Sequence, residues 1–367
     1  MAKSRLHQLS ELGQSVWIDY LSRDLLRTGE LERMTSEDAV VGVTSNPTIF
    51  QKAISHGDAY DDQLREVLAD EDDPKEVFLR LAVGDVADAC DLLRPIWDGG
   101  HGQDGYVSIE VDPNLAFDTD ATIAEAQRLH DLVDRPNCFV KIPGTSDGLP
   151  AIEEMIARGR NINVTLIFSL QRYAEVVEAY LRGLERLVES GGDPTRVASV
   201  ASFFVSRVDT EADRRLDEVG AADLKGKLAV ANAKLAYQRY KELFAGARWE
   251  ALEARGACKQ RCLWASTSTK NPAYRDVLYV EELIGPETVN TMPEETIEAF
   301  QDHGEVALTL ERDPDEARHV FEQVEAVGVD YDDVVVTLEQ EGVQKFSDSF
   351  KELLEGVKSK RGELVSA

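Results

Sequence analysis

Positively charged residues are scarce in this chain of 367 residues, in which 40 Lys and Arg stand against 69 Asp and Glu and give a formal net charge of −29. Nucleic acids and anionic membranes bind basic surfaces, so this balance argues against both as partners. No window approaches the roughly 18 consecutive apolar residues of a membrane-spanning helix. A small anionic ligand would need a local cluster of Lys or Arg.

Cysteine is also rare, and the four cysteines are Cys90, Cys138, Cys258 and Cys262. The last two are separated by three residues and lack the second pair or nearby His that a zinc site needs. The sequence has no Walker A or H-E-x-x-H motif. These absences, and the lack of an apolar segment near the N-terminus, predict a reducing cytoplasmic location and no metal site.

What the sequence does contain is a regular alternation of short apolar segments with longer amphipathic ones. Repeated strand–helix order predicts parallel strands joined by right-handed crossovers, and eight such strands close into a (β/α)8 TIM barrel. The expected strands are 15–21, 39–46, 105–112, 137–143, 162–169, 198–206, 261–266 and 287–292.

Helical patterns fill the intervals, and Asp118, Ser146 and Thr210 are expected near helix N-termini as caps. Extra helices are expected at the N-terminus, between the second and third strands, and in an acidic C-terminal extension over about 313–365. Because no Pro- or Ser-rich linker is present, we expect one domain over 1–367. The extension is expected to cover the barrel mouth or to mediate self-association. The expected helices are 22–33, 58–70, 75–96, 119–134, 148–159, 170–190 and 209–244.

Polar side chains share one face of six predicted strands. Strand side chains alternate between two faces, and the apolar face must pack on the helices, so the polar face points into the barrel. These residues lie toward the C-terminal halves of their strands, where barrel enzymes keep their active sites. A water-filled polar lumen is the alternative interpretation. The inward polar residues include Asp19, Thr44, Asn46, Ser108, Glu110, Lys141, Asn163, Thr165 and Ser202.

Lys141 is unusual because it lies in the middle of a predicted strand. A lysine removed from water loses its proton more easily and can attack a carbonyl to form a Schiff base. The alternative is a structural ion pair with Glu110 or Asp19. Schiff-base chemistry also needs proton shuttles, which these two carboxylates can supply, and Thr165 can hold a water for one of them.

Other polar residues suit a sugar-like ligand. Asn46, Asn163 and Ser202 can bind hydroxyls or support residues that do. Arg207 closes the sixth strand, and the segment 266–272, which begins at Ser266 and contains Lys270, is expected to open a helix. Hydroxyls and a cation at a helix start form a phosphate cradle, with a simple helix cap as the alternative.

Four motifs, in order, resemble the transaldolase family: 43–50 (VTSNPTIF), 107–111 (VSIEV), 140–145 (VKIPGT) and 161–169 (NINVTLIFS). The resemblance runs from about residue 15 to 295 and is closest to the longer bacterial subgroup typical of actinobacteria. It implies a class I aldolase barrel without metal or cofactor. The implied reaction, in the pentose phosphate pathway, moves a dihydroxyacetone unit from sedoheptulose 7-phosphate to glyceraldehyde 3-phosphate, giving erythrose 4-phosphate and fructose 6-phosphate.

The resemblance also implies residue roles. Lys141 would form the Schiff base, Asp19 would act as acid and base at the hydroxyl beside the broken bond, and Glu110 would act through a water held by Thr165. The dihydroxyacetone unit would be held by Asn46, Asn163 and Ser202, and the phosphate by Arg207. Many family members carry an arginine after the seventh strand, whereas this chain has Ser-Thr-Ser-Thr-Lys there, so Lys270 is expected to take that role.

Three alternatives stay open at this stage. A Schiff-base aldolase would release free dihydroxyacetone instead of transferring it. A metal-dependent isomerase or hydrolase would use Glu110 and Asp112, although none of the six histidines falls at a predicted strand end, as such an enzyme would normally require: His7, His56, His101, His130, His303 and His319. A barrel without catalysis would serve as a binding module. The expected partners are small sugar phosphates, and the chain is expected to be a monomer or a homodimer.

Overall fold

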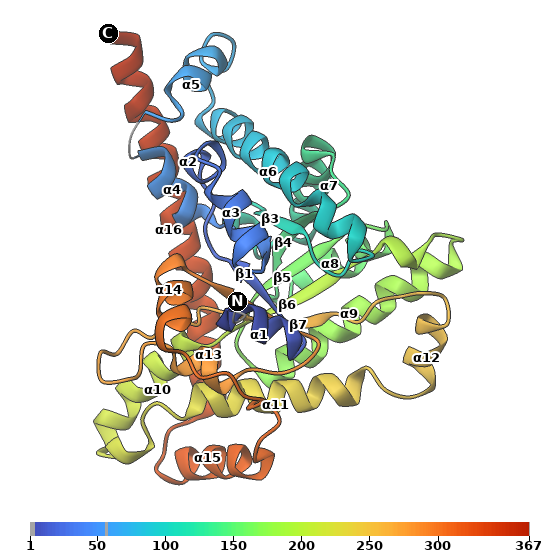
Figure 1. The fold of residues 1–367 in the computed structure, drawn as a ribbon, viewed down its shortest axis with the longest axis vertical. Coiled ribbons are helices and arrows are strands. Elements are labelled where there is room, and N and C mark those ends of the chain that lie inside the picture. Colours follow the sequence, from blue (N-terminus) through green and yellow to red (C-terminus); the bar gives the residue numbers. More distant parts are fainter. Residues whose placement is uncertain (1–3, 56–57, 367) are drawn as a thin grey trace.

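The computed structural model describes residues 4–55 and 58–366, and its centre is a closed barrel of eight parallel strands in the order β1 to β8 (Figure 1). Each strand overlaps one of the eight predicted segments, so the (β/α)8 TIM barrel is confirmed. Among the residues named above, His56 lies outside the described part of the chain. The strands are β1 (Gln14–Ile18), β2 (Val40–Val43), β3 (Tyr106–Glu110), β4 (Cys138–Pro143), β5 (Ile162–Ile167), β6 (Ser199–Phe204), β7 (Arg261–Ala265) and β8 (Thr288–Met292).

Helices surround the barrel, with α1 before the first strand, α4 to α6 between β2 and β3, and α15 and α16 as the C-terminal extension. Of the described helices, not one has the length and apolarity needed to cross a membrane. The helices are α1 (Arg5–Glu11), α2 (Arg23–Arg27), α3 (Glu30–Glu37), α4 (Pro47–Ser55), α5 (Asp61–Val67), α6 (Pro74–Gly99), α7 (Thr119–Val133), α8 (Gly148–Ala157), α9 (Leu170–Glu189), α10 (Ser206–Val219), α11 (Leu228–Leu243), α12 (Ala247–Glu253), α13 (Leu278–Glu282), α14 (Glu294–His303), α15 (Pro314–Ala326) and α16 (Tyr331–Ser366).

Two predicted helices are each divided at a glycine. In the segment 22–33, Gly29 has φ 76° and separates α2 from α3. In the segment 209–244, Gly220 has φ 75° and ends α10 well before α11 begins. Residues with a Cβ rarely adopt this left-handed conformation, so these glycines end the helical runs that the apolar periodicity alone would continue.

The three predicted caps have different outcomes. Asp118 is confirmed, because its side chain accepts a hydrogen bond from the backbone N–H of Ala121 at the start of α7. Ser146 is wrong: the hydroxyl that accepts from the Gly148 N–H at the start of α8 belongs to Thr145. Thr210 is also wrong, because α10 begins earlier and Thr210 donates to the Ser206 carbonyl from within the helix.

An aromatic layer fills the part of the barrel lumen nearer the amino ends of the strands. The rings of Tyr106 and Phe139 stack with centroids 4.1 Å apart, and Trp17 packs 6.0 Å from Phe139. A Cβ on Gly42 would lie 2.5 Å from the Trp17 ring, so β2 must carry glycine here to leave room for the indole. This layer forms an apolar base for the polar residues that face the lumen nearer the carboxyl ends of the strands.

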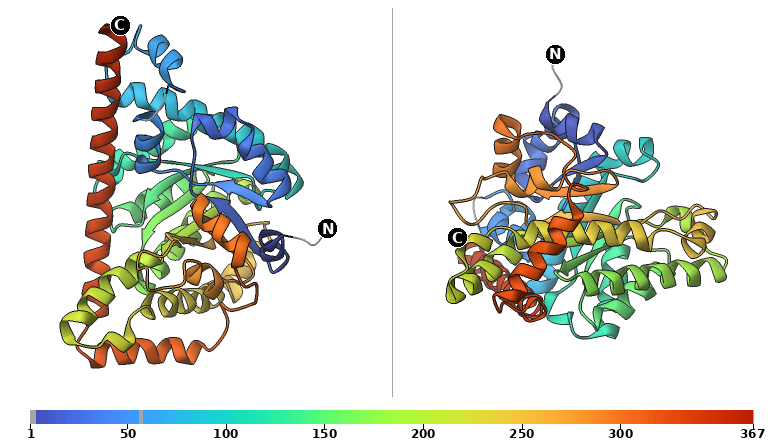
Figure 2. Two further views of the ribbon diagram at one scale, coloured as in Figure 1. Left: turned by 60° about the vertical axis from the view of Figure 1, so that its left-hand side comes forward. Right: turned by 90° about the horizontal axis from the view of Figure 1, so that it is seen from below.

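The helix α16, 36 residues long, lies along one side of the barrel (Figure 2). It packs on α4, α6 and α10, which belong to three different parts of the chain. Its Phe350 meets Phe78 of α6 edge to face with ring centroids 5.9 Å apart. A Cβ on Gly342 would lie 3.0 Å from a Leu166 methyl, so the helix approaches the end of β5 closely at this glycine.

Candidate active site

Three of the four predicted catalytic residues, Asp19, Lys141 and Thr165, line a cavity of about 130 Å³ at the carboxyl ends of the strands. Barrel enzymes build their sites at this end, from strand ends and the loops that follow them. The lining residues are Asp19, Thr44, Asn46, Lys141, Thr165, Ser202, Phe204, Arg207, Ala265, Ser266, Ser268, Lys270, Thr291, Pro293 and Phe346.

The strand register explains why Lys141 enters the lumen. Lys141 is paired with Glu110 on β3 and with Asn163 on β5. Side chains of paired residues project from the same face of a sheet, so these three form one row across the inner wall. Lys141 is 5 % exposed, and its Nζ donates to the Ser45 carbonyl at 3.0 Å and to Glu110 Oε2 at 3.2 Å.

Asp19 follows directly after β1 and faces the same cavity. Its Oδ1 accepts a hydrogen bond of 2.6 Å from the Thr44 hydroxyl, which is also 2.7 Å from the Thr291 hydroxyl. Burial raises the pKa of Asp19 above the ordinary aspartate value, while the Lys141 charge and the Thr44 hydrogen bond oppose this shift. A buried carboxyl group with a raised pKa holds a proton more readily than an exposed one, which suits a group that takes up a proton and returns it during a reaction.

Glu110 does not line the cavity itself but contacts Lys141, and 3 % of its side chain is exposed. Burial raises its pKa, and the attraction and hydrogen bond of Lys141 oppose the shift. Its Oε1 and the Thr165 hydroxyl are buried without a hydrogen-bond partner in the described part of the chain. Buried polar atoms are normally satisfied, so both atoms are available to a water or a substrate group.

The remaining predicted polyol-binding residues have different places. Ser202 lines the cavity and donates to Asn163 Oδ1 at 2.6 Å. Asn163 does not line the cavity; it is fully buried and donates to the Ser108 hydroxyl at 3.1 Å. Asn46 lines the cavity, while its Oδ1 accepts from the Ile49 N–H at 3.0 Å and caps α4.

Two cations lie on the side of the cavity formed by β6 and β7. Arg207 lies at the start of α10, and its Nη1 is buried without a partner among the described residues. Burial lowers the pKa of the Arg207 guanidinium, although the carboxylates of Glu110 and Asp19 oppose the shift, and an arginine remains charged at neutral pH. Lys270 donates to the Ser268 hydroxyl at 2.6 Å, and Ser266 lies 2.9 Å from the Ser206 hydroxyl.

The helix expected to begin at 266–272 is absent from its predicted place. The segment is a loop, and the next helix, α13, begins only at Leu278. Contacts outside the segment determine its path, because Tyr274 donates to Asp213 of α10 and a Cβ on Gly226 would lie 2.8 Å from the Tyr274 ring. Ser266 and Lys270 nevertheless line the cavity with Arg207, although no helix begins in their own loop.

Phe346, Thr291 and Pro293 are lining residues that the sequence analysis did not identify, whereas Ser268 belongs to the predicted phosphate-binding segment 266–272. Val343, Phe346 and Phe350 recur at helical spacing, which indicates a buried face of a helix. This signal does not identify what that face covers. Phe204 lies two residues after Ser202 in β6, so strand alternation puts it on the same inward face, and it also lines the cavity.

The pair needed by the metal-dependent alternative is not assembled. Asp112 follows the end of β3 and lies 2.9 Å from Lys75 Nζ, and it also accepts from the Asn114 N–H. Glu110 instead faces Lys141. Among the described residues, no group of three or more His, Cys, Asp or Glu side chains is placed to hold a metal ion.

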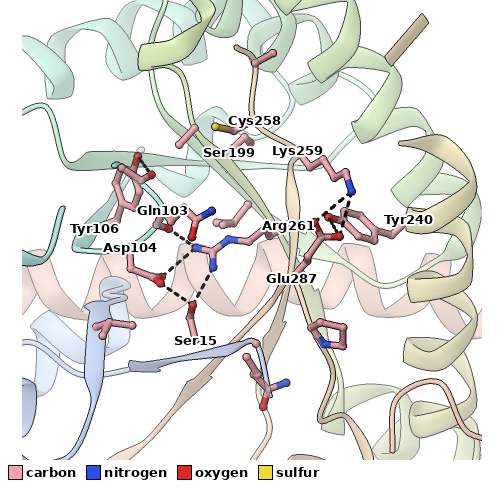
Figure 3. Close-up of a pocket in the computed structure, with 18 of the residues that line it drawn as sticks. Ser15, Gln103, Asp104, Tyr106, Ser199, Tyr240, Cys258, Lys259, Arg261 and Glu287 are labelled. Atoms are coloured by element: carbon pink, nitrogen blue, oxygen red, sulfur yellow. Dashed lines mark hydrogen bonds and ion pairs between the residues drawn. The ribbon is translucent and has the colours of Figure 1, made fainter. Parts of the chain in front are cut away.

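A second, larger cavity of about 540 Å³ lies at the amino ends of the strands (Figure 3). Arg261 bonds Asp104 at 3.0 Å there, and Lys259 bonds Glu287 at 3.1 Å. Because its cations are already paired with carboxylates and this end of a barrel contributes to stability, the cavity offers little to a charged ligand. The smaller cavity around Lys141 is the candidate active site.

Comparison with known proteins agrees with this geometry. The profile of the family described as Transaldolase/Fructose-6-phosphate aldolase matches residues 16–357. A transaldolase of Frankia alni is 55% identical over 353 residues, covering 95% of each chain, and one of Acidothermus cellulolyticus is 54% identical over 355 residues, covering 96% of this chain and 95% of its own. A transaldolase of Mycolicibacterium paratuberculosis is 53% identical over 362 residues, covering 97% of each chain. The chain belongs to the transaldolase/fructose-6-phosphate aldolase family.

Proposed function

We propose that this chain is a transaldolase that transfers a dihydroxyacetone unit from sedoheptulose 7-phosphate to glyceraldehyde 3-phosphate. The observation that carries the proposal is the buried Lys141 amine, which lies 3.2 Å from Glu110 and lines one cavity with Asp19. The name transaldolase borne by relatives more than 50% identical supports the same activity.

The first steps convert the ketose into a Schiff base. The Lys141 amine adds to the C2 carbonyl, and the carbinolamine loses its oxygen as water after a proton reaches it. Glu110 is the group in contact with Lys141 Nζ that can exchange this proton. A water between its Oε1 and the Thr165 hydroxyl would carry the proton, and both atoms lack another partner among the described residues.

The carbon–carbon bond then breaks beside the imine. Asp19 removes the proton from the C4 hydroxyl, the electrons of the C3–C4 bond move toward the protonated imine, and the shortened aldose leaves. The enamine on Lys141 adds to the aldehyde carbon of the acceptor, and Asp19 returns its proton to the new hydroxyl. Water finally releases the new ketose. The raised pKa of Asp19 favours a group that alternates between base and acid.

The substrate phosphate is assigned to the side of Arg207 and Lys270. Arg207 has a buried, unpaired Nη1 in the described part of the chain, and Lys270 lines the same cavity. A phosphate oxygen can accept from both cations and from the Ser266 and Ser268 hydroxyls. The hydroxyls of the dihydroxyacetone unit are assigned to Asn46 and Ser202, with Thr44 and Asn163 holding Asp19 and Ser202 in place.

The proposed reaction needs no metal or redox cofactor, because the protonated imine itself accepts the electrons of the broken bond. We place the enzyme in the cytoplasm as a single domain acting on small sugar phosphates. A Schiff-base aldolase that releases free dihydroxyacetone is the second candidate, since the family description covers both activities.

The test is reduction with borohydride in the presence of fructose 6-phosphate, followed by peptide mass mapping. We expect a three-carbon adduct on Lys141 and none in Lys141→Ala. Lys234→Ala is the matched control, because Lys234 bonds Glu282 outside the cavity and its loss should leave the adduct intact. An adduct on another lysine, or none on the wild type, would overturn the proposal.

A further inference from the structure

Phe346 lies in the middle of α16 and reaches the candidate active site from the C-terminal extension. Its ring centroid lies 5.9 Å from Lys141 Nζ and 5.7 Å from Arg207 Cζ, and the side chain is 5 % exposed. The ring is therefore close both to the amine assigned to the Schiff base and to the cation assigned to the phosphate. None of the other cavity-lining residues comes from the C-terminal extension.

The helix is held on both sides of Phe346. Before it, Arg172 of α9 bonds Glu339 at 3.3 Å, and Arg215 of α10 bonds Asp333. After it, Ser349 accepts a hydrogen bond of 2.8 Å from Thr48 of α4. Contacts to three separate helices fix the position of the ring, so Phe346 is a wall of the cavity in the fold itself.

The chemistry proposed for Lys141 depends on a wall that controls which molecules reach the enamine. After the carbon–carbon bond breaks, the enamine must wait for an aldehyde. If a proton reaches its nucleophilic carbon first, the imine forms, and one water then releases free dihydroxyacetone and restores the Lys141 amine. Transfer therefore requires that water and protons be kept from the enamine while the aldehyde is admitted.

An aromatic ring at this place can act in two ways. Its apolar surface excludes water from the region above Lys141. Its π face also attracts the positive charge of the protonated imine that precedes cleavage and follows transfer, because a cation within about 6 Å of a ring centroid is stabilised. Both effects favour the covalent intermediate over its hydrolysis.

We propose that Phe346 is a specificity-determining residue that directs the Lys141 enamine to an aldehyde acceptor and suppresses the release of free dihydroxyacetone. The inference rests on the proposed transaldolase function. It assigns the C-terminal extension a part in choosing between the two activities in the family description.

The test measures free dihydroxyacetone released per transfer event, with fructose 6-phosphate as donor and a saturating aldehyde acceptor. We expect Phe346→Ala to raise this ratio at least tenfold, Phe346→Leu to raise it less, and kcat for transfer to fall by a smaller factor than the ratio rises. Phe350→Leu is the matched control on the same helix. Phe350 is 4 % exposed and packs on Phe78 without lining the cavity, so its variant should keep the wild-type ratio.

A second variant covers the case in which Phe346→Ala fails to fold. Phe346→Tyr keeps the ring but adds a hydroxyl that can bind water, and it should raise the ratio at least threefold. The inference is overturned if every folded Phe346 variant stays within twofold of the wild type, or if Phe350→Leu raises the ratio equally. Failure of the proposed function is distinguishable, because the wild type would then give no borohydride adduct on Lys141, or would form the adduct without transferring the dihydroxyacetone unit to the aldehyde acceptor.

Discussion

Glu110 and Lys141 are register partners on β3 and β4, and their side chains meet inside the barrel with Nζ 3.2 Å from Oε2. The side chains are 3 % and 6 % exposed respectively. A buried ion pair is costly to break by removing one partner, because the other is left without solvent or a counter-charge. The protonation of Glu110 is therefore tied to the charge of Lys141, which is the coupling that the proposed imine formation requires.

Replacing Lys141 by alanine should abolish turnover while the fold persists. The nucleophile is lost, so we expect kcat to fall by at least about a thousandfold. Glu110 can take a proton in place of its cation, since burial already raises its pKa, and this limits the loss of stability. Steady-state kinetics and circular dichroism measure the two effects. Activity within tenfold of the wild type would contradict the role of Lys141.

Asp19→Asn should stop the reaction at a later step. The Schiff base still forms, but the C4 hydroxyl keeps its proton, and kcat should fall by about 10² to 10⁴. Borohydride trapping with fructose 6-phosphate should then give a six-carbon phosphorylated adduct on Lys141 instead of a three-carbon one. Asp112→Asn is the control: its carboxylate bonds Lys75 away from the cavity, so its kcat should be unchanged. A three-carbon adduct formed at the wild-type rate in Asp19→Asn would contradict the assignment.

The parts of the site that lie on strands could be predicted from the sequence. Alternation along β3, β4 and β5 places Glu110, Lys141 and Asn163 on one face, and parallel register then brings them into a row. This information is local, because a strand's period of two needs only a few residues to be recognised. The eight strands were predicted for the same reason.

The parts that depend on distant contacts could not be predicted. The apolar spacing around Phe346 indicates a buried helix face, but nothing in the sequence says that this face meets Lys141. The loop after β7 was expected to open a helix at Lys270, yet the bond from Tyr274 to Asp213 and the packing on Gly226 direct it elsewhere. These contacts join segments far apart in the chain, where local propensity gives no signal.

Removing the two cations near the cavity should separate phosphate binding from catalysis. We expect Arg207→Ala to raise KM for phosphorylated donors by about 10- to 100-fold, because a charged hydrogen-bonding partner of the phosphate is lost. Lys270→Ala should have a smaller effect, since a lysine gives a point charge in place of a planar fork. Inhibition by inorganic phosphate provides a second measurement and should weaken in parallel. An unchanged KM in both variants would place the phosphate elsewhere.

Asp209, on the same helix as Arg207, should make the stability of the enzyme depend on pH. It is 1 % exposed and accepts hydrogen bonds from the Ala229 N–H at 2.7 Å and from Tyr279 at 2.9 Å. Burial raises its pKa from 3.8 to about 7. Between pH 3.8 and about 7, the native state holds a proton on Asp209 that the unfolded chain has released. The stabilisation from this proton is therefore complete below pH 3.8 and is lost as the pH rises through about 7.

We therefore expect Asp209→Asn, whose side chain is neutral at every pH, to remove this dependence. The free energy of unfolding of the wild type, relative to the variant, should fall between pH 5 and pH 8 by up to about 3 kcal/mol. Urea unfolding of both proteins at the two pH values measures this difference, and the other titrating groups cancel in the comparison. If the difference between the two proteins is the same at pH 5 and pH 8, Asp209 does not titrate in this window. Its carboxylate would then be ionised throughout, stabilised by Ala229 and Tyr279 against the cost of its burial.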